Sequence, residues 1–185
     1  MLVFSKCRRD WRQISARATR TAGLLACAIH LSSLAAHAGE APRKTVLAHY
    51  MACCPQAGLQ SSTRQYEDEI RAANENGIDG FAINFGSYVR SPSHLQVIER
   101  LYAAAAHFPN FNLLLSFDQS SPSEAVELIM KYASNPNSLR KNGRLVVSGW
   151  GQTPHWATEV RERARAHGIE IFLVPHMNYP CLRPE

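Results

Sequence analysis

Six side chains that can contact a polar ligand come at or just before the ends of short apolar runs of the sequence. They are two histidines, two asparagines, one aspartate and one tryptophan: His49, Asn84, Asp118, Trp150, His176 and Asn178. Hydrogen-bonding groups beside an aromatic ring suit a polyol, whereas an anion would require clustered arginines or a glycine-rich loop at a helix start. We therefore predict a sugar-binding site made of these six residues.

Asn84 and Asp118 carry most of this prediction. Asn84 lies within an apolar run, and a buried amide is costly unless it is hydrogen-bonded. Asp118 directly follows another apolar run, although it is also suited to capping a turn. The alternative for both histidines is a structural role. The alternative for Trp150 is packing in the core rather than offering a flat platform to a sugar ring.

The apolar runs recur with a regular period. Their starts lie near Thr45, Ile78, Phe111, Arg144 and Ile169, so that the first four are 33 residues apart and the fifth follows 25 residues later. One strand with its crossover helix takes roughly 30 residues. The runs are apolar on both faces, which is typical of parallel strands covered by helices. The sequence therefore predicts five successive βα units in a parallel α/β sheet.

Helix start signals stand between these runs. A serine followed three residues later by glutamine or glutamate forms a capping box, and a proline fits the first helical position. The expected N-terminal caps are Ser62, Ser93, Ser121 and Thr153. Four glutamates fall on these helices, where solvated outer faces are expected for them: Glu124, Glu127, Glu159 and Glu162. The strict alternation of strand and helix excludes all-α and sandwich folds.

The first strand is followed by His49–Cys54, which contains neither a dinucleotide-binding glycine motif nor a Walker loop. Short strands that each end in a polar or aromatic residue favour a (β/α)8 TIM barrel, whose chemistry lies at the carboxyl ends of the strands. Five units occupy residues 45–185, whereas a complete barrel takes about 250 residues. We therefore expect a barrel truncated to about its first five βα units.

Residues 1–38 have the pattern of a signal peptide. Six basic residues precede the apolar run Ala22–Ile29, and the segment ends in Ala36-His37-Ala38, which is a typical cleavage pattern. The alternative is an amphipathic helix at the start of the mature domain. The pair Arg8-Arg9 is only loosely similar to a twin-arginine signal. The expected domain is then residues 39–185, in a secreted or periplasmic protein.

The net charge changes when the expected signal peptide is removed. The whole chain has 20 basic and 15 acidic residues, and residues 39–185 keep 14 of each. The basic surplus therefore belongs to the signal peptide, and no basic patch with interleaved aromatic residues argues for nucleic-acid binding. No later run reaches the length of a membrane span, so we expect no membrane partner after signal removal.

Three cysteines remain after signal removal: Cys53, Cys54 and Cys181. An odd number in an exported protein implies at least one free thiol or an intermolecular bridge. A bridge from Cys181 to the other pair requires Cα atoms within about 7 Å. We expect no cofactor. A metal-dependent barrel hydrolase that uses His49, Asp118 and His176 is an alternative, although no His-x-His pair follows the first strand.

The sequence resembles glycoside hydrolase family 71, the α-1,3-glucanases or mutanases, over about residues 45–180. A related endo-mannosidase family shares part of the pattern. The similar blocks occur in the family's order: His49–Met51, Asn76–Gly86, Leu115–Asp118, Lys131–Pro136, Val146–Gly151 and Val174–His176.

The resemblance implies an exported endo-glycanase that cleaves α-glucan by inversion, with a polysaccharide or oligosaccharide as its partner. His49, Asn84, Asp118 and His176 match positions that line the family's cleft. The family's acid pair lies in an Asp-Tyr-Gly-Glu type motif that is absent from these 185 residues. We therefore expect no catalytic residue before Glu185 and no hydrolysis by this chain alone. A non-catalytic carbohydrate-binding barrel fragment is the alternative.

Overall fold

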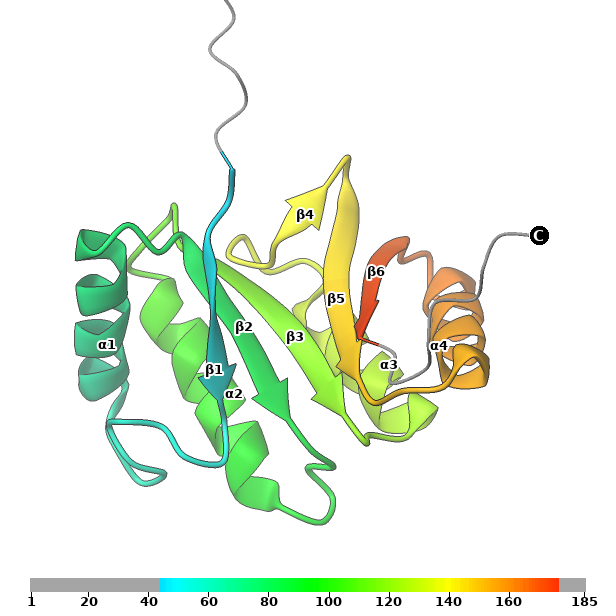
Figure 1. Ribbon diagram of the computed structural model, residues 1–185, viewed down its shortest axis with the longest axis horizontal. Helices are drawn as coiled ribbons and strands as arrows, with labels where there is room; N and C mark the ends of the chain where they lie inside the picture. The colour runs from blue at the N-terminus through cyan, green and yellow to red at the C-terminus, as the bar shows by residue number, and fades with distance from the viewer. Residues whose placement is uncertain (1–43, 177–185) are drawn as a thin grey trace, which may run out of the picture. The chain divides into compact units, whose positions relative to one another are not determined.

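The computed structural model describes residues 44–176. The signal peptide expected at residues 1–38, Asn178 and Cys181 lie outside the described residues, and of His176 only the backbone is described. The elements, shown in Figure 1, are the strands β1 (Leu47–Met51), β2 (Gly80–Phe85), β3 (Asn112–Asp118), β4 (Arg140–Lys141), β5 (Arg144–Trp150) and β6 (Ile171–His176), and the helices α1 (Thr63–Glu75), α2 (Pro92–Ala105), α3 (Pro122–Tyr132) and α4 (Pro154–Ala166).

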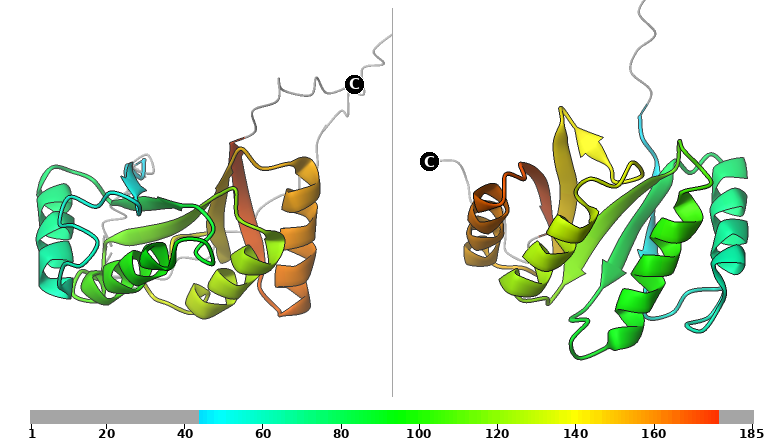
Figure 2. Two further views of the ribbon diagram at one scale, coloured as in Figure 1. Left: turned by 90° about the horizontal axis from the view of Figure 1, so that it is seen from below. Right: turned by 180° about the vertical axis from the view of Figure 1, so that it is seen from behind.

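The five long strands form one parallel sheet in the order in which they occur in the sequence. β1 pairs with β2, β2 with β3, β3 with β5, and β5 with β6. All four helices lie on the same face of this sheet (Figures 1 and 2). A doubly wound sheet reverses its strand order and carries helices on both faces. The described part of the chain does neither, and the prediction of successive parallel βα units is confirmed.

Strand β4 was not predicted. It is antiparallel to the start of β5, and the two-residue turn between them consists of Asn142 and Gly143, with φ angles of 52° and 77°. An Asn-Gly pair is the preferred sequence for such a hairpin turn because both positions require positive φ. The signal was therefore present in the sequence.

Strands β1 and β2 begin two residues later than expected. β2 starts at Gly80, whose neighbour across the sheet is Asn112 on β3. A Cβ at position 80 would lie 2.1 Å from the backbone oxygen of Asn112. Only glycine permits this close approach of the two strands. Asp79, just before it, accepts the N–H of Val46 at 2.8 Å from that nitrogen, which ties the start of β1 to β2.

The helix caps are mostly as predicted. Ser121 and Thr153 accept backbone N–H groups at the starts of α3 and α4, and Gln65 accepts the N–H of Ser62 at the start of α1. The prediction for α2 was wrong, because this helix begins at Pro92 with Ser91 before it, rather than after Ser93. Proline has the fixed φ of a first helical residue, so the helix starts as soon as proline permits it.

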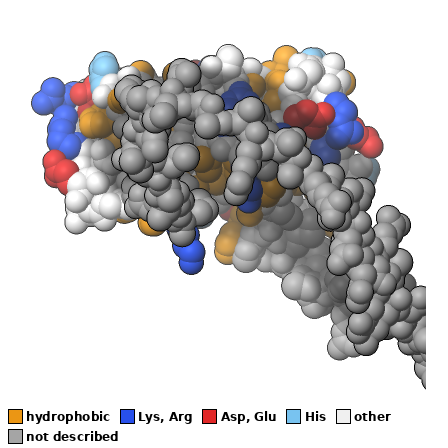
Figure 3. Space-filling model, turned by 90° about the horizontal axis from the view of Figure 1, so that it is seen from above, with side chains coloured by type: hydrophobic (Ala, Val, Ile, Leu, Met, Phe, Trp, Pro, Cys, Tyr) orange, Lys and Arg blue, Asp and Glu red, His pale blue; other side chains and the backbone are white. Residues whose placement is uncertain are grey.

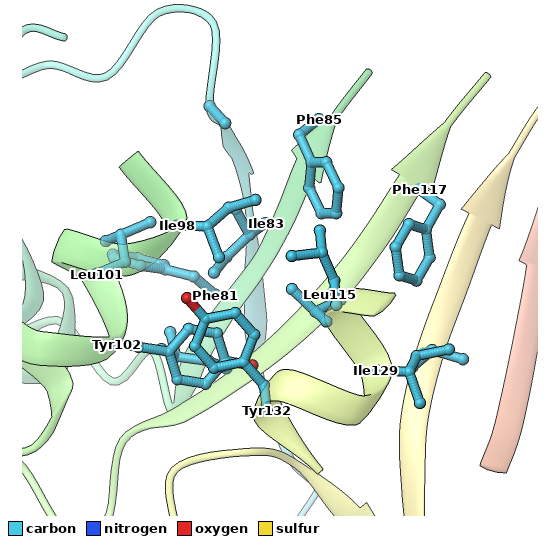
Figure 4. Close-up of a cluster of buried hydrophobic side chains, with 14 of the residues drawn as sticks. Phe81, Ile83, Phe85, Ile98, Leu101, Tyr102, Leu115, Phe117, Ile129 and Tyr132 are labelled. Carbon is cyan, nitrogen blue, oxygen red and sulfur yellow. The ribbon is translucent and has the colours of Figure 1, made fainter. Parts of the chain in front are cut away.

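The core lies between the sheet and the helices. Alternate residues of the strands point toward the helices, as Figure 4 shows for Phe81, Ile83, Phe85, Leu115 and Phe117. The other buried strand members of this cluster are Leu113, Leu145, Val147 and Ile171. The rings of Phe85 and Phe117 meet edge to face with centroids 5.1 Å apart. Burying a side chain of this size stabilises the fold by about 1.5–3 kcal/mol. The intervening residues therefore point to the face of the sheet that carries no helix.

The surface of the described part carries charges of both signs. In Figure 3, acidic and basic side chains lie next to one another at both ends of the view. Among residues 44–176, no helix combines the length and the apolar composition that crossing a bilayer requires.

Candidate functional site

A small hollow of about 290 Å³ lies at the carboxyl ends of four strands. His49 and Met51 reach it from β1, Asn84 from β2, Asp118 from β3 and Trp150 from β5. Four of the six predicted site residues therefore lie side by side, although they are up to about a hundred positions apart in the sequence. The sheet brings them together because parallel strands end at a common edge.

Asn84 forms part of the floor of the hollow. Its side chain is buried, with only 4% of its surface exposed. Its position is fixed on both sides, since it pairs in register with Met51 and with Ser116, and its backbone oxygen accepts the N–H of Ala52 at 2.9 Å. The amide can donate and accept hydrogen bonds at once, which suits a ligand hydroxyl.

Asp118 provides the strongest acceptor in the hollow. Its Oδ1 atom is buried and accepts no hydrogen bond from any residue in the described part of the chain. A buried polar atom without a partner costs about 1–3 kcal/mol, and more for a charged group. Native structures rarely keep such an atom unless water or a ligand satisfies it. A donor from outside the protein, such as a sugar hydroxyl, would remove this cost.

The segment after Asp118 is held in place by α4. Gln119 has a φ of 52°, so the chain turns sharply at the end of β3. Trp156 on α4 donates its indole N–H to the backbone oxygen of Ser120 over 2.8 Å. Ser121 then begins α3 with its capping box. These contacts hold the backbone that directly follows Asp118.

Trp150 lies at the rim of the hollow with 45% of its surface exposed. The chain turns away immediately after it, because Gly151 has a φ of 62°. Gln152 is buried and donates its amide N–H to the backbone oxygen of Phe117, 3.4 Å away, and it does not line the hollow. An exposed indole ring at the edge of a polar hollow can stack on the face of a sugar.

His49 lies at the opposite rim. It is exposed, and its Nε2 atom is 3.1 Å from the sulfur of Met51. His49 also borders a second hollow of about 430 Å³ between β1 and the β1–α1 loop. Tyr50, which also borders this hollow, donates its hydroxyl to Glu69 on α1 over 2.6 Å, and burial together with this bond raises the pKa of Tyr50.

His176 pairs in register with Trp150, so its backbone is at the same edge of the sheet. Its side chain is not described, and Asn178 lies outside the described residues. Sequence reasoning missed Met51 and Ser116. Met51 lines the hollow, and Ser116 is buried beside Asn84 in register. Their spacing could have identified them. Met51 lies two residues after His49 and Ser116 two residues before Asp118, so each shares a strand face with a predicted site residue.

Glu127 and Glu162 are exposed as expected, whereas Glu124 and Glu159 are only partly exposed, which corrects the expectation for these two. Glu124 accepts hydrogen bonds from Ser87 and from the cap residue Ser121. Burial acts to raise the pKa of Glu124, but these hydrogen bonds outweigh it, and the pKa is lowered. Glu127 accepts the hydroxyl of Tyr88, whose pKa is raised by burial and by that bond. Both carboxylates thus hold the β2–α2 loop that follows Asn84.

No group of three or more histidine, cysteine, aspartate or glutamate residues with metal-binding geometry occurs in the part of the chain that the structure describes. The alternative metal site of His49, Asp118 and His176 stays a prediction, because the side chain of His176 is not described. Within the hollow, the donor set is one carboxylate, one amide, one imidazole and one thioether.

The chain is similar to glycan-cleaving enzymes. The profile of Glycosyl hydrolase family 71 matches residues 42–181. A glucan endo-1,3-alpha-glucosidase of Schizosaccharomyces pombe is 34% identical over 125 residues, which is 60% of this chain and 29% of that protein. An ascus wall endo-1,3-alpha-glucanase of the same yeast is 28% identical over 149 residues, which is 72% of this chain and 33% of that protein.

A solved structure described as a glycoside hydrolase-like protein has a similar fold. Its TM-score is 0.52 at 16% sequence identity, over 71% of this chain and 51% of that one. The chain thus spans about a third of the length of the curated relatives it matches and about half of this structure.

Proposed function

Since the chain belongs to glycosyl hydrolase family 71, we propose that it binds α-1,3-glucan in the hollow at the carboxyl ends of its strands. Both S. pombe relatives are named for action on α-1,3-glucan. The observation that carries the proposal is the buried, unpartnered Oδ1 atom of Asp118, which shares one hollow with Asn84 and Trp150.

The chemistry of the hollow supports a sugar as its ligand. Asp118 accepts a hydroxyl hydrogen, Asn84 donates and accepts, and Trp150 offers an apolar face beside them. A hollow of about 290 Å³ is of the size of one to two sugar rings, at the lower end of the range for ligand pockets. We propose that His49 and His176 flank this position and that Asn178 extends it.

We further propose that the βα units are the first five of a (β/α)8 barrel. The consecutive strand order and the helices on one face support this, because successive units of a barrel have that arrangement. The pattern of residues 1–38 supports export to a secreted or periplasmic location.

For catalysis, we propose that the family's reaction proceeds with inversion and that this chain alone does not perform it. Inversion requires an acid and a base carboxyl group about 6.5–9.5 Å apart. Asp118 is the one carboxylate among the described residues that line the hollow. Binding of glucan without cleavage is therefore the function that we propose for this chain by itself.

The test is binding of the purified chain to insoluble α-1,3-glucan, measured by depletion from solution. Asp118→Ala should weaken binding about 10- to 100-fold, because a hydrogen bond to a charged group contributes about 1.5–3 kcal/mol. Glu75→Ala is the matched control, since Glu75 is an exposed carboxylate at the end of α1.

Circular dichroism should show the same fold for both variants. Unchanged glucan binding by a folded Asp118→Ala chain would refute the assignment of the hollow. Equal loss in both variants would show that net charge, and not the hollow, controls binding.

A further inference from the structure

Two adjacent cysteines follow β1, and Cys54 borders the second hollow of about 430 Å³. Cys53 and Cys54 lie in a turn closed by a hydrogen bond from the N–H of Cys54 to the oxygen of Met51, at 3.1 Å. Ala52, just before them, donates its N–H to the backbone oxygen of Asn84. The pair is thus fixed to the sheet at the edge where the polar residues gather.

The two sulfur atoms face each other. They are 2.6 Å apart, both are in the thiol form, and either can act as the hydrogen-bond donor. Cys54 is exposed and Cys53 is partly exposed, so small reagents can reach the pair. The hydrogen bond with Cys54, together with burial, raises the pKa of Cys53. Cys54 is the more exposed of the two residues, so an exchange reaction begins at its sulfur.

We propose that Cys53 and Cys54 form a redox-active dithiol that a small disulfide oxidant converts reversibly to a vicinal disulfide. The Cys54 thiolate attacks one sulfur of the oxidant and expels its first thiolate. Cys53 then loses its proton to water, and its sulfur attacks the Cys54 sulfur of the mixed disulfide and expels the second thiolate. Two protein thiols are oxidised to one disulfide, and one disulfide of the oxidant is reduced to two thiols.

The geometry makes this disulfide easy to reduce again. Adjacent Cα atoms are about 3.8 Å apart across a trans peptide bond, which is below the usual range of about 4.4–6.8 Å for disulfides. The closed ring is therefore strained, and strained disulfides have higher reduction potentials than structural ones. Such bonds are the labile ones, so a mild dithiol should reopen the ring.

The experiment is oxidation of the full chain with oxidised glutathione, followed by alkylation of remaining thiols, trypsin digestion and mass spectrometry. Trypsin places Cys53 and Cys54 together on residues 45–64 and Cys181 on residues 166–185. We expect peptide 45–64 to become lighter by two hydrogen atoms and to lose both alkylation sites. Dithiothreitol should restore both sites.

Three variants make the result specific. Cys53→Ser and Cys54→Ser should each stop at a mixed disulfide with glutathione, because the second thiol is missing. Cys181→Ser should leave the oxidation of peptide 45–64 unchanged. A cross-link between peptides 45–64 and 166–185, or a mixed disulfide that persists in the wild-type chain, would overturn the proposal.

Discussion

Glu124 shows how a single residue connects the surface of a helix to the surroundings of the hollow. Its two oxygens accept hydrogen bonds from the β2–α2 loop, through Ser87, and from the start of its own helix, through Ser121. A carboxylate at the start of a helix also interacts favourably with the helix dipole. The negative form of Glu124 is therefore the form that stabilises this contact.

This residue should produce a measurable dependence of stability on pH. The pKa of Glu124 in the folded chain lies below its ordinary value of 4.5. A lowered folded pKa means that the contribution to the free energy of unfolding is complete above the unfolded pKa and is lost as pH falls through the folded pKa. Glu124→Gln should therefore reduce the thermal midpoint at about pH 7 and reduce it less at about pH 3.

Thermal unfolding at both pH values checks this, with Glu162→Gln on the exposed face of α4 as the control. The control should change the midpoint little at either pH. A difference between wild type and Glu124→Gln that stays constant from neutral to acid pH would contradict the proposed role of the charge.

At the scale of the elements, the packing of β2 against β3 depends on one glycine. A Cβ at Gly80 would come within 2.1 Å of backbone on β3, whereas a Cβ at Gly86 would meet its nearest backbone atom at an ordinary 3.6 Å. The same substitution should therefore have different consequences at the start of β2 and directly after its end. Backbone atoms cannot rotate away as a flexible side chain can.

Gly80→Ala should lower the free energy of unfolding by about 2–3 kcal/mol or prevent folding, because the two strands must separate. Gly86→Ala should change it by less than about 1 kcal/mol. Urea unfolding followed by circular dichroism measures both. Equal stability of the two variants would show that β2 and β3 do not approach at Gly80 as described.

At the scale of the whole molecule, hydrolysis depends on how many carboxylates meet at the ligand. The polar face of the sheet brings one carboxylate into the hollow among residues 44–176. One carboxylate can orient a hydroxyl group, but it cannot protonate a leaving group while another group activates water. Under the proposed function, we therefore expect this chain to bind glucan without cleaving it.

We expect the purified chain to release no reducing sugar from α-1,3-glucan above the level of a buffer blank. Wild type and Asp118→Asn should be indistinguishable in a reducing-end assay over many hours. Circular dichroism, measured on the same preparations, checks that both proteins are folded. Robust release that disappears in Asp118→Asn would show that Asp118 belongs to a working catalytic pair.

The sequence by itself determined the order and type of the main elements. Apolar runs at a 33-residue spacing, separated by helix caps such as Ser121, predict parallel strands joined by helices. The apolar runs and the caps can both be read from the sequence because each depends only on neighbouring residues. It also marked Asn84 and Asp118, because a polar residue within or at the end of an apolar strand is unusual wherever the strand lies. Two differences from the prediction are also local. Helix α2 begins at Pro92 rather than after Ser93, and Asn142 with Gly143 forms the turn between β4 and β5.

Only the tertiary structure decided which of these residues meet. The register of four parallel strands sets His49, Asn84, Asp118 and Trp150 around one hollow, and a register shift of one residue would have turned each side chain to the helix face. The partners of Glu124 and the facing sulfurs of Cys53 and Cys54 depend on loop conformations that no periodicity encodes. Strand pairing and loop geometry are long-range properties, because they are fixed by contacts between segments that are distant along the chain.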